Sequence, residues 1–548
     1  MFRDHDGAGG VLAAYPVVMA SRSRGTLPAA AAGMAAVLLG TGAGELTAAL
    51  LAPGASPLAA VGGALVDLAP GWAKDAAIGL FGTGDKLALA AGIVVVLLLT
   101  AGGAGVLEAR RAPWGRVVVL GLGVVGIAAA VTRSDAGIAA WAPSLIAGVV
   151  AAAALGPLVR LAAAGFTDAG RSRTPVGAAE AIGTTAPPPA RTRLDRRAFL
   201  RGSGVAAAAG ILAAVGAAAM QSARQAASTV RDAIVLPRAT RTAAPIPAAA
   251  ELGIPDLAPV ITPNAAFYRI DTALLVPQVD PRDWSLRIHG LVAQEVVLGW
   301  DELLALPLQE SVTTLACVSN EVGGDLIGNA VWLGYPIRDL LARAVPDPDA
   351  DMVLSRSVDG FTASTPLAVL TDERDAILAV GMNGEPLPAD HGFPVRMVVP
   401  GLYGYVSATK WVTELEVTRF DAATAYWTDR GWSELGPIKL QSRIDVPRAG
   451  RRLSAGETVI AGVAWQQHVG VTGVDVQVDD GAWMPARLAA AISEDTWVQW
   501  SVPWTATAGT HRLRCRAIGA RGEVQTATRT PVVPDGATGR HEITVTVD

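Results

Sequence analysis

Six long, apolar stretches without a charged residue in the first 223 residues constrain this chain more than any other feature. They cover residues 26–44, 46–66, 87–107, 117–132, 136–159 and 202–223. About 20 apolar residues span the hydrocarbon core of a bilayer as a helix. Pro53 and Pro57 interrupt the second stretch and would break such a helix. The pattern therefore predicts about five membrane helices, with 52–86 as a loop whose entry into the membrane stays open. The predicted helices lie at about 27–51, 87–107, 116–133, 137–160 and 203–220.

Positive charge is distributed unevenly over the loops between these helices. With the N-terminus inside, 14 arginines fall on inner loops, and only Lys74, Lys86 and Arg133 fall on outer ones. Cytoplasmic loops retain an excess of Lys and Arg. We therefore expect a multi-pass cell-membrane protein whose membrane region covers 1–223 and includes a cytoplasmic linker at 164–202. Everything after Met220 is expected to be extracytoplasmic.

A paired-arginine motif precedes the fifth predicted helix. It reads Asp195-Arg196-Arg197-Ala198-Phe199-Leu200-Arg201 and is followed by an alanine-rich segment. This order resembles a twin-arginine signal, which is read by a translocon that carries folded, cofactor-loaded proteins. The same arginines would also act as a simple cytoplasmic anchor. We favour the signal, which implies that the following domain binds its cofactor before it crosses the membrane.

Composition excludes several classes of protein. With only Cys317 and Cys515, the chain cannot build a disulfide framework or a four-cysteine iron–sulfur cluster. Its net charge of -5 offers no basic field for nucleic acid. The only histidine before residue 223 is His5, outside the predicted helices, and no Cys-x-x-Cys-His motif is present. We therefore expect no haem, and an external electron partner such as a cytochrome.

The second part of the chain has its own organisation. Prolines recur through 224–260, which predicts an extended tether between membrane and enzyme. Residues 450–548 alternate between apolar and polar positions in short runs separated by turn residues. This spacing predicts an immunoglobulin-like β-sandwich. Its strands are expected at 458–465, 473–478, 497–502, 511–518 and 542–547, and the alternation turns Cys515 toward the core.

Between tether and sandwich, a few residues carry distinctive chemistry. Cys317 ends a short apolar run, and His391, Arg396 and Lys410 follow within Gly-rich segments. A lone thiolate makes a poor zinc site, but it suits a metal whose other ligands arrive on an organic cofactor. Arginine and lysine beside glycine backbone suit a phosphate group. The set favours a phosphate-bearing metal cofactor over a cysteine nucleophile.

At these residues the sequence resembles the sulfite oxidase family of molybdopterin-dependent oxidoreductases. The resemblance covers about 240–548 and rests on Ile261 to Arg269, Val312 to Glu321, His391 to Gly401 and Ser407 to Trp411. It implies an α+β molybdopterin-binding catalytic domain at 261–447 and a dimerisation domain at 450–548. The expected fold is thus a transmembrane helical bundle, the molybdopterin domain and the immunoglobulin-like sandwich, assembled as a homodimer.

The resemblance also implies roles for individual residues. Cys317 is the expected thiolate ligand of molybdenum. The pterin is expected to contact Asn264, Phe267 and Tyr268. Its pyran and phosphate end would be held by His391, Arg396, Ser407 and Lys410. Arg269 is expected near the substrate, Thr362 and Ser364 on the pocket wall, and Tyr426 in either the active site or a packing role.

These expectations lead to an enzyme that transfers an oxygen atom with two electrons. Sulfite or a related small sulfur compound is the expected substrate. Animal members of the family carry arginines shortly after the cysteine, whereas this chain carries Glu321. A carboxylate there weakens the argument for an anionic substrate and keeps a methionine sulfoxide reductase-like activity as the alternative. A third hypothesis is a non-catalytic surface-binding protein. The combination of Cys317, Arg396 and Lys410 argues against it.

Overall fold

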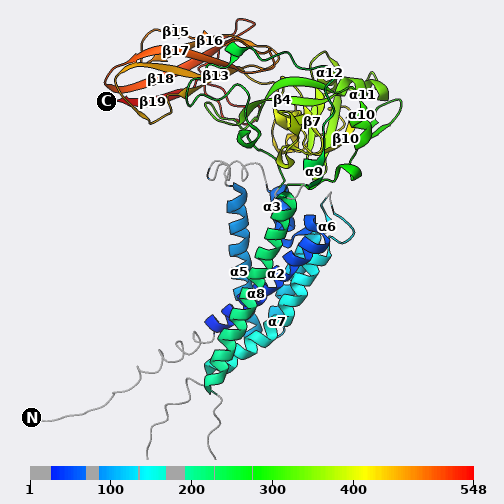
Figure 1. Cartoon of the computed structure of the whole chain (residues 1–548). Coiled ribbons are helices and arrows are strands. Elements are labelled where there is room, and N and C mark those ends of the chain that lie inside the picture. The colour runs from blue at the N-terminus through cyan, green and yellow to red at the C-terminus, as the bar shows by residue number, and fades with distance from the viewer. Residues whose placement is uncertain are drawn as a thin grey trace, which may run out of the picture. The chain divides into compact units, whose positions relative to one another are not determined.

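The computed structural model describes residues 26–69, 80, 85–133, 136–167, 192–226, 229–273 and 276–548. The chain divides into two compact units, Met1–Ala226 and Ala227–Asp548, shown in Figure 1. We call them the helical unit and the β-rich unit.

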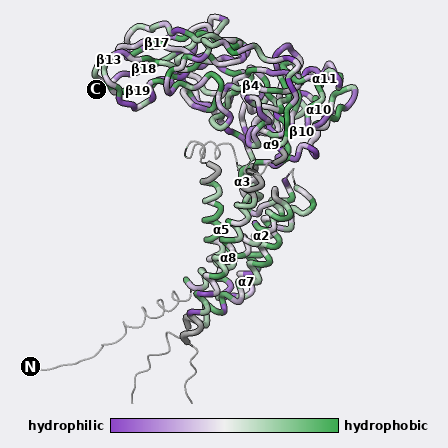
Figure 2. Tube along the Cα trace, viewed as in Figure 1, coloured by the Kyte–Doolittle hydropathy of each residue, from purple (hydrophilic) through white to green (hydrophobic). Residues whose placement is uncertain are grey.

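The helical unit contains five helices that are long and apolar enough to cross a membrane. They are α2 (Thr26–Leu51), α5 (Asp85–Arg110), α6 (Trp114–Val131), α7 (Ala142–Thr167) and α8 (Thr192–Ala226). Their apolar character appears as green tube in Figure 2. Glycine allows the helices to approach closely, since a Cβ on Gly33 would collide with the backbone of Ala101, and one on Gly42 with Gly210. The predicted number of apolar helices is confirmed.

The bounds of the elements differ from the prediction in three places. Part of the predicted 52–86 loop is the helix α3 (Pro57–Leu68), because Pro57 is tolerated in the first turn and the Ser56 hydroxyl accepts from Ala59 N at 3.2 Å. Helix α7 begins later than expected and ends at Thr167. Helix α8 begins at Thr192, so Arg196 and Arg197 lie inside it.

The linker predicted at 164–202 is therefore too long at both ends. The linker bounds were predicted from the charged residues at which the apolar stretches end. Arginine is a good helix former, however, so a helix can continue through such residues. Residues 168–191 of that linker, and 70–79 and 81–84 of the predicted loop, lie outside the described ranges.

Two sheets build the first half of the β-rich unit. The first has the order β2 (Val296–Gly299), β1 (Ser285–Gly290), β10 (Val412–Thr418), β5 (Met352–Ser357) and β6 (Thr362–Pro366). The second has the order β3 (Gln309–Ala316), β4 (Ile327–Pro336), β7 (Ile377–Met382) and β8 (Glu385–Pro386), and β9 (Arg396–Val398) also pairs with β7. Only the β1–β10 pair is parallel among these.

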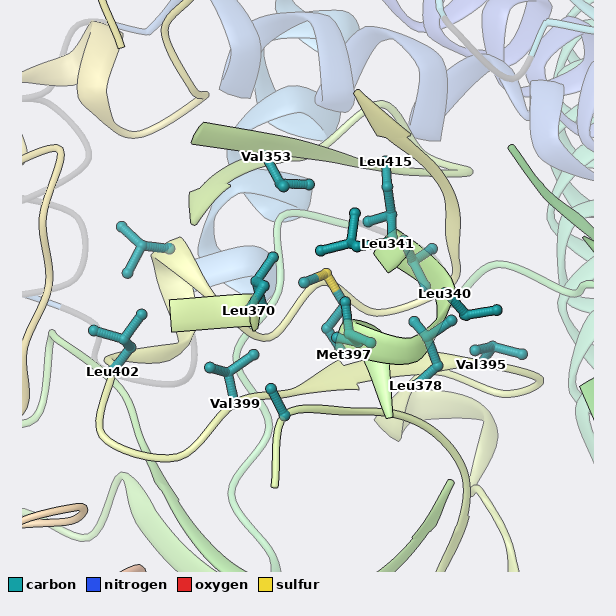
Figure 3. Packing of buried hydrophobic residues seen from close by; sticks show 14 of the residues in the cluster. Leu340, Leu341, Val353, Leu370, Leu378, Val395, Met397, Val399, Leu402 and Leu415 are labelled. Carbon is teal, nitrogen blue, oxygen red and sulfur yellow. The ribbon is translucent and has the colours of Figure 1, made fainter. Parts of the chain in front are cut away.

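Short helices complete this part. They are α9 (Thr229–Ala233), α10 (Trp300–Ala305), α11 (Ile337–Ala344) and α12 (Leu367–Thr371). The last three share one apolar core with the sheets. Leu340 and Leu341 of α11 pack in the same cluster as Val353 and Met397, as Figure 3 shows. Helix α11 is amphipathic and buries its apolar face in this core.

The second half of the β-rich unit is a two-sheet sandwich. One sheet has the order β11 (Gln441–Val446), β13 (Gly456–Trp465), β17 (Val498–Ala506) and β16 (Arg487–Leu488). The other has the order β12 (Arg452–Leu453), β19 (Glu542–Val547), β18 (Gly509–Gly519), β14 (Val471–Val478) and β15 (Met484–Pro485). Both sheets contribute to one core that includes Trp500, Val476 and Cys515.

The five strands expected in this region are confirmed, as is the inward direction of Cys515. The sandwich starts earlier than expected, because β11 pairs with β13. Residues 441–446 therefore belong to it and not to the catalytic domain, which was expected to reach 447.

The proline-rich segment is packed against the β-rich unit. Both the backbone N–H and the hydroxyl of Thr240 donate to the Leu308 carbonyl, at 2.7 and 2.8 Å. Arg231 donates to the carbonyls of Pro386 and Leu387, each at 3.0 Å. Backbone N–H groups outside helices and sheets need other acceptors. Here, carbonyl groups at the ends of strands serve as these acceptors. From Thr229 onward the segment is thus part of the fold and not a free tether.

Candidate cofactor site

Cys317 lies directly after β3, at the start of the connection to β4. Its side chain is buried. Its N–H donates to the Leu326 carbonyl at 3.0 Å, and its own carbonyl accepts from Asn320 N at 3.1 Å. Burial raises the pKa of the Cys317 thiol, while hydrogen bonds from Ser319 and the positive charge of Lys410 act in the opposite direction. A metal cation at the sulfur would overcome the cost of burial and stabilise the thiolate.

Aromatic rings form one wall beside this cysteine. Phe267 and Tyr268 stack with centroids 5.2 Å apart, and Phe267 meets the edges of Trp332 and His391 at 5.8 and 5.6 Å. Burial and the nearby Cys317 raise the pKa of the Tyr268 hydroxyl, and Arg396 opposes this. Tyr268 therefore lies within electrostatic reach of both the thiol and the guanidinium.

Arg396, on β9, is a buried cation with unusual hydrogen-bond partners. Its side chain is only 4% exposed, and its guanidinium donates to the carbonyls of His391, Met397 and Ala408 at 3.2, 3.3 and 3.5 Å. Burial lowers its pKa to about 10. Among the residues that the structure describes, no carboxylate forms an ion pair with it. A buried cation without a counter-charge is costly, so the site favours an anionic ligand.

Lys410 is also buried, but it has a carboxylate partner. Its Nζ donates to Asp271 Oδ2 at 3.0 Å and to the Asp390 carbonyl at 2.8 Å. Burial lowers the Lys410 pKa to about 8. The negative charge of Asp271 opposes this shift, and the positive charge of Arg396 adds to it. Arg269 Nε donates to the same Asp271 oxygen at 3.0 Å. One carboxylate thus neutralises part of the charge of two predicted site residues.

Two buried polar atoms at predicted positions have no hydrogen-bond partner among the described residues. They are Nδ1 of His391 and Oγ of Ser364, whose side chains are 2% and 1% exposed. His391 Nε2 donates to the Asn264 carbonyl at 3.2 Å, which leaves Nδ1 as an acceptor. Burial lowers the His391 pKa to about 4, so the ring is neutral. Buried polar groups are normally satisfied, and a pterin with its N–H and oxygen groups would satisfy both.

Three further predicted residues make hydrogen bonds within the chain. The Asn264 amide donates to the Met382 carbonyl at 3.3 Å and accepts from Asn383 at 2.7 Å. The Ser407 hydroxyl donates to the Tyr403 carbonyl at 2.9 Å. Thr362 Oγ1 accepts from Tyr426 N at 2.9 Å.

The Tyr426 ring lies against a cation. Arg430 covers this ring, with its guanidinium carbon 3.6 Å from the ring centroid. Thr362 thus fixes the backbone at Tyr426 while Arg430 fixes its ring. The arrangement supports the packing role that the sequence left open for Tyr426.

The structure adds residues to which the sequence analysis gave no role. Asp271 bridges Arg269 and Lys410, and Trp332 lies under the Arg396 guanidinium at 5.1 Å. Burial and Cys317 raise the pKa of the Tyr403 hydroxyl to about 12. Tyr403 lies between the motifs His391 to Gly401 and Ser407 to Trp411, so the sequence could have drawn attention to it. Trp332 is one apolar residue in a buried strand, so no signal marked it.

Comparison with known proteins agrees with this chemistry. Residues 273–427 match the family model of the oxidoreductase molybdopterin binding domain. The chain is 32% identical over 321 residues to mitochondrial sulfite oxidase of Homo sapiens, covering 50% of this chain and 58% of the relative, so it spans less than two thirds of that protein. It is 32% identical over 157 residues to the uncharacterized oxidoreductase YuiH of Bacillus subtilis, covering 29% of this chain and 76% of the relative.

A solved structure is also similar. The sulfane dehydrogenase SoxCD of Paracoccus pantotrophus matches with a TM-score of 0.44 and 25% identity, over 49% of this chain and 75% of that one.

Proposed function

Because this chain belongs to the sulfite oxidase family of molybdopterin-dependent oxidoreductases, we propose that its β-rich unit binds a molybdenum–molybdopterin cofactor and transfers an oxygen atom to or from a small sulfur compound. The observation that carries the proposal is the buried guanidinium of Arg396, which has no ion-pair partner among the described residues. The charge of Arg396 and the Cys317 thiol both influence the nearby Tyr268 hydroxyl. The bound molybdenum would supply the two-electron chemistry.

The chain's own residues would hold and orient this group. Cys317 offers the thiolate to the metal, and Arg396 offers positive charge to the cofactor phosphate. Lys410 and the segment around Ser407 would bind the same phosphate end of the cofactor. His391 Nδ1 and Ser364 Oγ are free to bond the pterin, beside Asn264, Phe267 and Tyr268. Arg269 and Thr362 are proposed at the substrate side, with Tyr426 a weaker candidate because of its packing.

We propose sulfite as the first substrate to test, with a methionine sulfoxide-type S-oxide as the alternative. The alternative is supported by the charge balance, since Asp271 partly neutralises both Arg269 and Lys410. Glu321, shortly after Cys317, adds a further negative charge. A neutral S-oxide would meet less repulsion there than a doubly charged anion.

We also propose a cellular setting. The five apolar helices anchor the chain in the cell membrane, and the arginine asymmetry places the β-rich unit outside the cytoplasm. Arg196 and Arg197 act as a twin-arginine signal. An external acceptor such as a cytochrome receives the electrons, and the immunoglobulin-like sandwich mediates homodimerisation. Reporter fusions placed after residue 230 test the orientation, and a cytoplasmic signal would contradict it.

One preparation tests the enzymatic proposal. The full chain is purified from a host that makes the cofactor and is analysed for molybdenum and pterin. It is then assayed with sulfite plus an artificial acceptor, and with methionine sulfoxide plus an artificial donor. We expect stoichiometric molybdenum and turnover of one of the two compounds. Folded protein without molybdenum would refute the proposal, and the active assay decides the direction of the reaction.

A further inference from the structure

The connection between β3 and β4, residues 317–326, carries Cys317 as its first residue. We call it the cysteine loop. Its two ends are joined, because Cys317 N donates to the Leu326 carbonyl at 3.0 Å. Its tip, at Gly323 and Gly324, is held by residues of the sandwich.

Arg443, on β11 of the sandwich, makes the direct contact with the tip. Its Nη1 donates to the Gly324 carbonyl at 2.8 Å, and the residue is buried. The Asp445 carboxylate fixes the other side of the guanidinium, with Nε donating to Oδ1 at 2.6 Å and Nη2 to Oδ2 at 3.3 Å. Because the guanidinium is planar and rigid, partners on two sides leave it a single orientation. Arg443 therefore connects the sandwich to the cysteine loop by a strong, directional hydrogen bond.

A second contact supports the same tip. Gly323 has a φ of +84°, and a Cβ there would collide with the His541 ring. This ring is itself fixed, because its Nδ1 accepts from Ile444 N at 2.9 Å. Ile444 follows Arg443 on β11, so one strand of the sandwich holds the tip through two neighbouring residues.

Hydrogen bonds inside the loop connect its tip to the cysteine. Gly324 N donates to the Glu321 carbonyl at 2.9 Å, and Leu326 N donates to Asn320 Oδ1 at 2.9 Å. Asn320 N in turn donates to the Cys317 carbonyl at 3.1 Å. A short loop bonded in this way moves as one piece, so a restraint at the tip also acts on Cys317.

We propose that Arg443 is a positioning residue for Cys317, which keeps the sulfur in place by holding the cysteine loop against the sandwich. That this sulfur serves as a metal ligand rests on the proposed function, whereas the restraint on the loop does not. The same contact restrains the backbone beside Glu321. The sandwich thus shapes the candidate cofactor site, in addition to its proposed part in dimerisation.

The test compares how fast iodoacetamide alkylates the two cysteines of the full chain, measured by mass spectrometry. The chain is purified in detergent from a host that cannot make the pterin. Cys317 is buried, so its alkylation rate reports how often the loop opens. Cys515 lies in the core of the sandwich and reports unfolding of that part in the same sample.

The first variant removes the direct contact. We expect Cys317 of Arg443→Gln to be alkylated about tenfold faster, with the rate at Cys515 unchanged. Arg516→Gln is the matched control, because Arg516 also pairs with one aspartate, Asp475, and does so within the sandwich. This control should leave both rates unchanged.

The second variant acts from the loop side. The added methyl group of Gly323→Ala would push the tip away from His541, so we expect Cys317 alkylation to rise about tenfold here too. Gly522→Ala is its matched control. Gly522 has nearly the same φ, +83°, but a Cβ there meets nothing within 4 Å.

Faster alkylation at Cys317 alone would support the inference. An unchanged rate at Cys317 in Arg443→Gln, or equal acceleration at both cysteines, would overturn it, because the second result would mean a general loss of stability. If Arg443→Gln does not fold, Gly323→Ala decides in the same way. These outcomes need neither molybdenum nor turnover, so failure of the enzymatic proposal would be recognised separately.

Discussion

Arg396 and Lys410 are both buried cations, but only Lys410 has a carboxylate partner among the described residues. Removing Arg396 would relieve a desolvation cost and leave no unpaired anion behind. The two residues were predicted as equivalents on the basis of residue type. Their partners separate them, because hydrogen bonding depends on which carbonyls and carboxylates the fold brings within 3.5 Å.

Replacing Arg396 with Met should prevent cofactor retention without unfolding the chain. The buried charge is lost, but three buried carbonyls lose their donor, so we expect the variant to fold with a stability lower by about 1–3 kcal/mol. Molybdenum and pterin content of the purified variant, with its thermal unfolding, measures both effects. Arg419→Met, which removes an exposed ion pair with Asp421, serves as the control and should keep its cofactor. Full loading of Arg396→Met would contradict the proposed role.

Cys317→Ser should leave the fold intact and abolish turnover with either sulfur compound. Serine is close to cysteine in size, but its oxygen cannot supply the soft thiolate that the metal is proposed to need. Activity assays and circular dichroism on the same sample check the two halves of this prediction. Retained turnover would refute the ligand assignment.

His541 should make the stability of the β-rich unit depend on pH. Burial and the charge of Arg443 lower its pKa to about 4, and its Nδ1 accepts from Ile444 N at 2.9 Å, so the folded state keeps it neutral. The unfolded chain takes up the proton below about pH 6.5. Stability is therefore fully present above that pH and is lost as pH falls toward 4, by about 3 kcal/mol in total.

Thermal unfolding between pH 6.5 and 5 tests this dependence, because few carboxylates titrate in that window. Asparagine can present an acceptor close to the position of Nδ1, so His541→Asn should reduce the dependence while retaining the bond to Ile444. The dependence that remains belongs to His391, whose pKa burial also lowers to about 4. Identical pH profiles for the two proteins would show that His541 is not responsible.

At the scale of elements, the proline-rich segment shows what a local sequence pattern can predict and what it cannot. Proline correctly argues against a long helix or central strand, and the segment is extended apart from short turns. Where its backbone groups bond is a different question. Thr240 bonds at Leu308, and Leu252 N donates to the Gln499 side chain at 2.7 Å. These partners lie far along the chain, so no local pattern could identify them.

A chain starting at residue 261 should accordingly be less stable than one starting at residue 229. The shorter form loses at least four backbone hydrogen bonds and the packing that accompanies them, which is worth about 4 kcal/mol. Chemical denaturation of the two forms measures the difference. Equal midpoints would show that the segment contributes no stability.

At the scale of the whole molecule, the helical and β-rich units have separate hydrophobic cores. We therefore expect residues 229–548 to be soluble without detergent when expressed alone, and to load molybdenum in the cytoplasm of a cofactor-competent host. The full chain should need detergent for extraction from membranes. Fractionation followed by metal analysis checks both statements, and aggregation of the isolated unit would contradict the separation.

The sequence alone determined the number of long apolar helices, five strands of the sandwich and the family, because composition, alternation and short motifs are local properties of the chain. It did not determine helix ends, since a charged residue need not end a helix. It also could not reveal the Asp271 bridge or Trp332 beneath Arg396. Only the tertiary structure decided these, because whether a buried polar group is satisfied depends on atoms brought together from distant parts of the chain.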